Sequence, residues 1–227
     1  MGEYFTMQYV LNQLIQGSNL SREEARETMR MIMDGEATPS QIGSLLTILR
    51  MKGETIDEIT GFAETMRSKS NHVNSDQREL LDTCGTGGDG GKTFNISTAA
   101  AIVAAAGGIT VAKHGNRAMS SRSGSADVLE ALGVNIELDP ETAASCLSEV
   151  GICFMFAQKY HQSMKYAAGP RKEIGFRTVF NMLGPLTNPA NANYQLFGVY
   201  DPNKTETIAF VLRELGLSRA LVVSSED

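Results

Sequence analysis

The chain has 227 residues, of which 42% are hydrophobic, and it carries 26 acidic side chains against 20 lysines and arginines, a formal net charge of −6. This length and apolar content suffice for a substantial core, and we expect two domains and a cytoplasmic location. The acidic balance argues against nucleic-acid binding, and no run of 18 apolar residues is present that would cross a membrane. Cys84, Cys146 and Cys153 lack metal-site spacing and are expected to be reduced thiols.

The first 70 residues predict a small all-helical domain. Three capping boxes recur at 17-residue intervals: Ser21/Glu24, Thr38/Gln41 and Thr55/Glu58. Each of these pairs is typical of a helix start. Apolar residues follow at helical spacing, as at Leu45, Ile48 and Leu49, so four short helices are expected to share one core.

An alternation of strands and helices follows a polar stretch at 68–79. Strands are predicted near 80–84, 109–112, 152–156, 194–199 and 220–223, and helices near 97–106, 125–132, 140–150 and 203–215. This alternation predicts an α/β fold with a mostly parallel sheet. The interval 159–188 interrupts it, and we expect that interval to return to the helical domain. The predicted domains are therefore 1–70 joined by helices in 159–188, and an α/β domain of 78–158 and 190–227.

A glycine-rich loop follows the first predicted strand. It reads Gly85-Thr86-Gly87-Gly88-Asp89-Gly90-Gly91-Lys92-Thr93, and a helix is expected to begin at Ser97. Glycines let backbone amides turn toward an anion, and a helix start adds free N–H groups and a positive dipole end. A carboxylate beside phosphates needs a cation between them, so Asp89 indicates a metal-chelated polyphosphate. A purely structural glycine-rich turn is the alternative.

Two familiar phosphate motifs do not fit this loop. Gly85, Gly87 and Gly90 satisfy G-x-G-x-x-G, but the next predicted strand leads into Lys113-His114 instead of the acid that would hold a dinucleotide's ribose. The Walker pattern fails because Thr86 stands where it requires glycine.

A second loop is basic and follows the strand predicted at 109–112. Between Gly90 and Ala126 the chain contains no acid, although Lys92, Lys113, Arg117 and Arg122 lie there. Ligands of open α/β sheets bind at the carboxyl ends of strands, so these cations are expected to line a ligand site. A solvated basic loop is the alternative.

These motifs, in their order and spacing, resemble the anthranilate phosphoribosyltransferases. The motifs that carry the resemblance are Gly85-Thr86-Gly87-Gly88-Asp89, Asn95-Ile96-Ser97-Thr98, Lys113-His114-Gly115-Asn116-Arg117 and Arg122-Ser123-Gly124-Ser125-Ala126-Asp127. The resemblance covers the whole chain. It implies a Mg²⁺-dependent transfer of phosphoribosyl from 5-phosphoribosyl 1-diphosphate to anthranilate in tryptophan biosynthesis, with release of pyrophosphate, by a homodimer that associates through its helical domain.

The resemblance also implies a role for each matched residue. The diphosphate end of the donor would be held by Gly85, Gly88, Asp89, Thr93, Asn95, Ile96, Ser97 and Thr98, with the Ser97 hydroxyl as a magnesium ligand. The other phosphate and the ribose would be held by Lys113, His114, Gly115, Asn116, Arg117, Ala118, Met119, Ser120, Ser121 and Ser125. Anthranilate would contact Gly85, Asn116, His161 and Arg171, the last of which offers paired donors to a carboxylate. No catalytic base is expected, because an aromatic amine is already a nucleophile and positioning with charge neutralisation suffices.

The sequence departs from this family at its carboxyl end. Members continue beyond the strand predicted at 220–223 into a loop whose Asp-Glu pair binds magnesium, and Glu226 and Asp227 align just before that pair. We therefore expect an incomplete sheet and slow or absent turnover by this polypeptide alone. Two alternatives remain: a pyrimidine nucleoside phosphorylase, which would show Lys-His-Ser in place of Lys113-His114-Gly115, and a non-catalytic phosphate-ligand-binding or dimerisation module.

Overall fold

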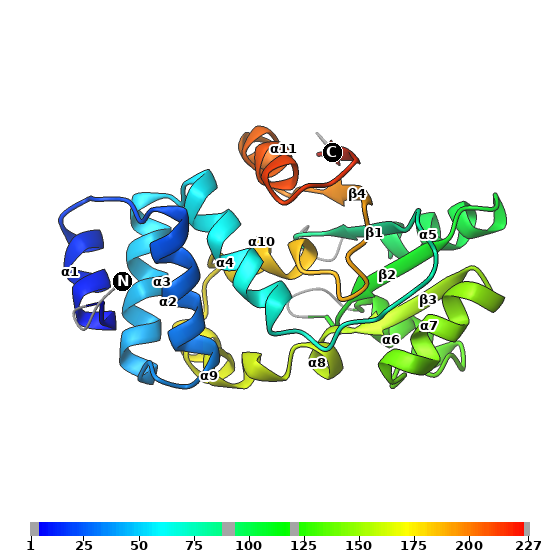
Figure 1. The fold of residues 1–227 in the computed structure, drawn as a ribbon, viewed down its shortest axis with the longest axis horizontal. Coiled ribbons are helices and arrows are strands. Elements are labelled where there is room, and N and C mark those ends of the chain that lie inside the picture. The colour runs from blue at the N-terminus through cyan, green and yellow to red at the C-terminus, as the bar shows by residue number, and fades with distance from the viewer. Residues whose placement is uncertain (1–4, 88–93, 119–122, 225–227) are drawn as a thin grey trace. The chain divides into compact units, whose positions relative to one another are not determined.

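The computed structural model describes residues 5–87, 94–118 and 123–224, and the chain divides into two compact units (Figure 1). The helical unit contains Met1–Ser70 and His161–Leu183. The α/β unit contains Asn71–Tyr160 and Gly184–Asp227. Each unit is thus assembled from two separate stretches of the chain.

The helical unit is built on four amino-terminal helices and a later pair. The first four are α1 (Met7–Ile15), α2 (Arg22–Met33), α3 (Pro39–Lys52) and α4 (Ile56–Ser68). The later segment contains the 3₁₀ helix η1 (Gln162–Met164), α9 (Lys165–Ile174) and α10 (Phe180–Leu183). All three predicted capping boxes are confirmed, at the starts of α2, α3 and α4.

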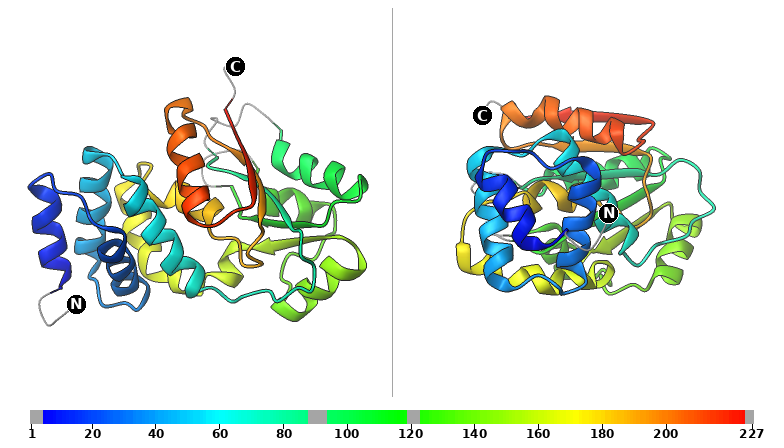
Figure 2. Two further views of the ribbon diagram at one scale, coloured as in Figure 1. Left: turned by 45° about the horizontal axis from the view of Figure 1, so that its top comes forward. Right: turned by 60° about the vertical axis from the view of Figure 1, so that its left-hand side comes forward.

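Small residues and one buried carboxylate hold the helical unit together. At Gly61 of α4 an added Cβ atom would lie 2.8 Å from the Cβ of Ala25 on α2, so these two helices pack in close contact. Glu58 is fully buried and accepts hydrogen bonds from the Leu20 amide at 3.0 Å and from the Thr55 amide at 2.8 Å. Figure 2 shows these helices and α9 as one bundle.

The α/β unit contains a five-stranded parallel sheet, which confirms the predicted fold class. Its strands are β1 (Leu81–Gly85), β2 (Val111–Gly115), β3 (Ile152–Phe156), β4 (Tyr194–Gly198) and β5 (Arg219–Val223), in the spatial order β3-β2-β1-β4-β5. The helices between them are α5 (Ile96–Ala106), α6 (Ser125–Ala131), α7 (Pro140–Glu149), α8 (Ala157–Tyr160) and α11 (Thr205–Glu214), with 3₁₀ turns η2 (Gly184–Leu186) and η3 (Pro202–Lys204).

The side chains of β3 alternate between two apolar clusters. Cys153 and Met155 belong to a cluster that includes Leu147 of α7, whereas Phe154 and Phe156 pack with Leu129 of α6. This alternation follows from the two-residue period of a strand. The sheet is therefore covered on both faces at β3, in contrast to β5, where Leu221 is 68% exposed.

One predicted boundary is wrong in a way that affects the site. The strand expected to end at Ala112 continues through Gly115, because β2 pairs in full register with β3 from Val111 to Gly115. Lys113 and His114 are consequently strand residues and not loop residues. Across the described ranges, no helix is both long and apolar enough to span a membrane.

Candidate functional site

The carboxyl ends of β1 and β4 lie where the direction of the sheet's connections reverses. From β1 the chain crosses to β2 and β3 on one side, whereas β4 is followed by β5 on the other side. Gly85, the last residue of β1, pairs with Gly198, the last residue of β4. Ligands of open α/β sheets bind beyond the carboxyl ends of the strands at such a reversal. This edge of the sheet is therefore the candidate site.

The chain leaves β1 in close contact with the end of β4. A Cβ atom at Gly85 would lie 2.8 Å from the carbonyl oxygen of Gly198, so a side chain there would force one backbone to move. The Thr86 amide donates to that oxygen at 2.9 Å, and the Tyr200 amide donates to Thr86 Oγ1 at 3.1 Å. Gly87 then has a positive φ of 64°, a conformation that favours glycine. The predicted glycine loop thus starts from a fixed position.

The amino end of α5 is tied to the segment that leads into α6. Asn95 Nδ2 donates to the Ser123 carbonyl oxygen at 3.2 Å, and Thr98 Oγ1 donates to Ser125 Oγ at 3.0 Å. The first turn of a helix presents N–H groups without partners inside the helix, together with the positive end of its dipole. Two strand-following segments therefore meet beside a helix terminus that suits an anion.

The loop after β2 is closed by Gly124 and Asp127. A Cβ atom at Gly124 would lie 2.8 Å from the Asn116 carbonyl oxygen, so the two ends of this loop approach more closely than a side chain allows. Asp127 Oδ2 accepts hydrogen bonds from the amides of Ala118 at 2.9 Å and Gly124 at 2.7 Å. These backbone hydrogen bonds lower the pKa of the Asp127 carboxyl. Asp127 therefore holds the two ends of this loop together, as a clasp does.

Arg117 is held against α6 in this structure. Its guanidinium pairs with Glu130 at 2.8 Å and Asp127 at 3.1 Å, and lies 5.5 Å from the ring centroid of Phe156. The hydrogen bonds from Glu130 and Asp127 raise the pKa of Arg117. Arg117 was predicted to bind a phosphate, and in this structure its charge is balanced by two acids of α6.

Lys113 and His114 lie inside the sheet, with only 2% and 4% of their surfaces exposed. Lys113 Nζ donates to the Thr83 carbonyl oxygen at 2.5 Å, and the His114 amide donates to Asp82 Oδ1 at 3.1 Å. Burial lowers the pKa of Lys113, and the nearby Asp82 carboxyl opposes that shift. These two residues were predicted to follow the strand that ends at Ala112, and that placement is wrong because β2 continues through Gly115.

His161 and Arg171 belong to the helical unit. His161 is 4% exposed, and its carbonyl oxygen accepts the Met164 amide at 3.0 Å. The Arg171 guanidinium on α9 lies 4.8 Å from the ring centroid of Phe180, and burial lowers the pKa of Arg171. A flat cation stacked on an aromatic ring keeps its edge donors free to bind a planar carboxylate.

The predicted site residues fall into three groups. Most of them lie at or near the carboxyl ends of β1 and β2, with Lys113 and His114 inside β2: Gly85, Asn95, Ile96, Ser97, Thr98, Lys113, His114, Gly115, Asn116, Arg117, Ala118 and Ser125. His161 and Arg171 are in the helical unit. The remaining predicted residues lie outside the described ranges: Gly88, Asp89, Thr93, Met119, Ser120 and Ser121.

Sequence reasoning missed the contribution of β4 and the function of Asp127. Gly198 and Tyr200 lie beside the start of the glycine loop because β4 pairs with β1, and strand order cannot be read from the sequence. Asp127 did carry a signal, since it stands three residues after Gly124, at a position where acids reach back to a helix start.

The described part of the site fits a magnesium ion that is held mainly by a phosphorylated ligand. Within the described ranges, no three His, Cys, Asp or Glu side chains gather into a metal-binding group. Mg²⁺ commonly takes its ligands from substrate phosphates, water and one or two protein oxygens. The half-buried Ser97 in the first turn of α5 offers one such oxygen. Asp89, Glu226 and Asp227 lie outside the described ranges.

Fold and site together define an α/β protein with a separate helical unit and a candidate anion site at the carboxyl ends of β1 and β2. The chain belongs to the glycosyl transferase family: the helical bundle domain of that family matches residues 8–70, and its a/b domain matches residues 77–227.

The chain is similar in sequence and in structure to anthranilate phosphoribosyltransferases. Anthranilate phosphoribosyltransferase from Acetivibrio thermocellus is 59% identical over 217 residues, which make up 96% of this chain and 63% of that protein. The anthranilate phosphoribosyltransferase structure from Thermus thermophilus has a TM-score of 0.91 and 49% identity, and the match covers 95% of this chain and 65% of that one. The enzyme from Saccharomyces cerevisiae, solved with PRPP and Mg, also has a TM-score of 0.91, with 28% identity and 99% and 67% coverage. The chain therefore spans a little under two thirds of the length of the curated relatives it matches.

Proposed function

We propose that this chain carries the donor site of an anthranilate phosphoribosyltransferase, which binds 5-phosphoribosyl 1-diphosphate with Mg²⁺. One observation supports this most directly: the glycine-bearing end of β1, the first turn of α5 and the loop clasped by Asp127 converge at one edge of the sheet. Such a convergence suits a ligand with phosphates at both ends. The name of the relatives, and the PRPP and Mg bound to the yeast enzyme, agree with this assignment.

In this proposal the two segments hold opposite ends of the donor. The amides of α5's first turn and of the glycine loop hold the diphosphate, while the segment at Asn116–Ala118 and Ser125 holds the ribose and its phosphate. Mg²⁺, when bound, neutralises the charge that develops on the departing pyrophosphate. The bond from ribose C1 to the diphosphate oxygen breaks, and its electron pair leaves with pyrophosphate. The amine nitrogen of anthranilate bonds to C1 and then loses a proton.

The acceptor assignment remains a prediction for four residues. Gly85, Asn116, His161 and Arg171 are proposed to contact anthranilate, with the Arg171 guanidinium on its carboxylate. Two properties of Arg171 support a carboxylate partner: its partial burial, which increases the strength of a charge-assisted bond, and its stacking on Phe180, which fixes the plane of the guanidinium.

Titration calorimetry with the whole chain tests the donor site. We expect 5-phosphoribosyl 1-diphosphate to bind, Mg²⁺ to strengthen the binding, and Ser97→Ala to reduce the gain from Mg²⁺. Ser148→Ala is a matched control, because its hydroxyl donates to the Ser145 carbonyl on the exposed face of α7. An absence of donor binding, or binding of uridine in its place, would contradict the proposal. A steady-state assay with both substrates then measures whether this chain turns over.

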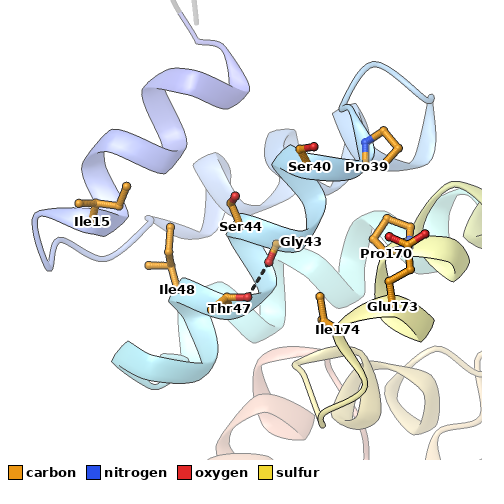
Figure 3. A pocket seen from close by; sticks show the side chains of 10 residues that line it. All are labelled: Ile15, Pro39, Ser40, Gly43, Ser44, Thr47, Ile48, Pro170, Glu173 and Ile174. Carbon is orange, nitrogen blue, oxygen red and sulfur yellow. Dashed lines mark hydrogen bonds between the residues drawn. The ribbon is translucent and has the colours of Figure 1, made fainter.

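We also propose that the helical unit forms a homodimer. A groove of about 560 Å³ runs between α1, α3 and α9 (Figure 3), and its walls combine Ile15, Ile48 and Ile174 with the small residues Gly43 and Ser44. Small residues allow helices of a second copy to approach closely, and Ile15 is 68% exposed. Sedimentation of Ile15→Asp should show a shift toward monomer. Val150→Asp in the α/β unit, with a starting exposure of 67%, should leave the dimer intact.

A further inference from the structure

The pairing between β1 and β2 differs from that of the other neighbouring strands. β1 pairs with β4 at five successive positions, and so does β2 with β3. Among the described residues, β1 pairs with β2 only at Leu81 and Val111, where the Leu81 amide donates to the Thr110 carbonyl oxygen at 3.0 Å.

Side chains occupy the backbone groups that a longer ladder would use. Continuing the parallel register from Leu81 and Val111 would pair the Thr83 amide with the Ala112 carbonyl, and the His114 amide with the Thr83 carbonyl. The structure instead gives three of these four groups side-chain partners. Asn188 Nδ2 donates to the Ala112 oxygen at 2.7 Å, Lys113 Nζ donates to the Thr83 oxygen at 2.5 Å, and Asp82 Oδ1 accepts the His114 amide at 3.1 Å.

All three of these side chains are buried within the α/β unit. Asp82 is 0% exposed, Lys113 2% and Asn188 4%. Buried polar groups are costly unless they are hydrogen-bonded, and each of these compensates a backbone group that would otherwise lack a partner. Their position is also specific, because the glycine loop follows β1 and the loop clasped by Asp127 follows β2.

We propose that Asp82, Lys113 and Asn188 form a wedge that separates the carboxyl ends of β1 and β2, and that Asp82 and Asn188 are positioning residues for the donor site. This role rests on the proposed function. A full ladder would bring the ends of the two strands to the ordinary spacing of about 4.8 Å. The wedge sets them further apart, so that a sugar carrying phosphates at both ends fits between the described segments 85–87 and 115–118.

Substitutions at Asp82 separate this role from simple stabilisation. Asp82→Asn keeps an oxygen that accepts the His114 amide, whereas Asp82→Ala removes it. In calorimetry with 5-phosphoribosyl 1-diphosphate and Mg²⁺, we expect Asp82→Ala to weaken binding at least about tenfold and Asp82→Asn to stay within about threefold of the parent. Asp57→Ala, at an exposed position of α4, is the control and should bind as the parent does.

Amide hydrogen exchange at His114 gives a readout that needs no ligand. Asp82→Ala should accelerate this exchange at least about tenfold, and Asp82→Asn should restore it. Where Asp82→Ala does not fold, Asn188→Ala tests the wedge through the Ala112 carbonyl, with the same expected loss of donor affinity.

The outcomes are distinct. Parent-like donor binding by Asp82→Ala overturns the wedge, and so does an equal loss in Asp82→Asn, because charge and not the hydrogen bond would then be the operative property. Failure of the parent chain to bind the donor refutes the proposed function instead. In that case unchanged exchange at His114 in Asp82→Ala still refutes the wedge, and accelerated exchange supports it.

Discussion

Glu58 provides a sharp test of how burial sets the energy of a capping interaction. The carboxylate is fully buried, and its Oε2 atom accepts both the Thr55 amide at 2.8 Å and the Lys52 ammonium at 3.0 Å. Glu58→Gln preserves the shape of the side chain and the Oε1 contact to the Leu20 amide, but it places an NH₂ group against two donors. The substitution therefore removes two hydrogen bonds without creating a cavity.

The expected cost follows from those two bonds. The bond to the Thr55 amide contributes about 1 kcal/mol, and the charge-assisted bond to Lys52 about 2 kcal/mol. In this variant Lys52 keeps its hydrogen bonds to Asn19 Oδ1 at 2.7 Å and to the Gly53 carbonyl oxygen at 2.9 Å, so its ammonium group still has two acceptors. We expect the free energy of unfolding to fall by about 3 kcal/mol, equivalent to a decrease in Tm of about 6–12 °C for a cooperative transition of this size.

A matched control is available in α2. Glu24 makes the same capping box, with Oε2 on the Ser21 amide at 2.8 Å, but in an exposed setting. Glu24→Gln should cost at most about 0.5 kcal/mol, because a glutamine at this position also completes a capping box, as Gln41 does in α3, and only the charge near the helix start is lost. Urea unfolding followed by circular dichroism measures both variants. Equal losses for the two substitutions, or a loss below about 1 kcal/mol for Glu58→Gln, would refute the reasoning that burial amplifies the cap.

Three other predictions follow from the site and from the ion pairs. Gly85→Ala should destabilise the chain by about 1–3 kcal/mol in urea unfolding and reduce donor affinity in calorimetry, because its Cβ would lie 2.8 Å from the Gly198 oxygen. Asp127→Ala removes the oxygen that both amides bind, so it should accelerate amide exchange at Ala118 and Gly124 and weaken donor binding, while Glu214→Gln on α11 should do neither. Burial raises the pKa of Glu64, but the hydrogen bonds from Arg22 and Arg26 outweigh it and bring that pKa to about 2. A carboxyl whose pKa is lower in the folded than in the unfolded state stabilises the fold at pH values above its unfolded pKa, and this stabilisation is lost as the pH falls through its folded pKa. The free energy of unfolding should therefore decline between about pH 5 and pH 2. This decline should be smaller by up to about 3 kcal/mol in Glu64→Gln.

Local signals predicted the elements of this fold well. The capping boxes depend on residues three apart, such as Thr38 and Gln41, and all three begin helices where expected. The five strands also lie near their predicted positions, because apolar segments between turn residues are read locally. The end of β2 could not be predicted in the same way. Lys113 and His114 are polar in the sequence, and only pairing with β3 makes them strand residues.

The candidate site was predictable in its segments but not in its partners. The glycine loop and the basic loop could be identified by composition, and the parallel sheet brings them to one edge. That Arg117 pairs with Glu130, or that β4 ends beside Gly85, depends on contacts between distant parts of the chain. The partners of such side chains are determined by the fold, so the sequence pattern identifies the cation Arg117 but not the carboxylate of Glu130 that neutralises it.

The divided construction of the helical unit has a consequence for biosynthesis. Met1–Ser70 leave the ribosome first, but α9, which packs on α3, belongs to a stretch that is translated only after residues 71–160. At about 5–20 residues per second, that interval lasts roughly 5–20 s. The nascent α3 surface stays uncovered throughout this time, and a chaperone that shields apolar helices would have its greatest effect on this chain during that interval.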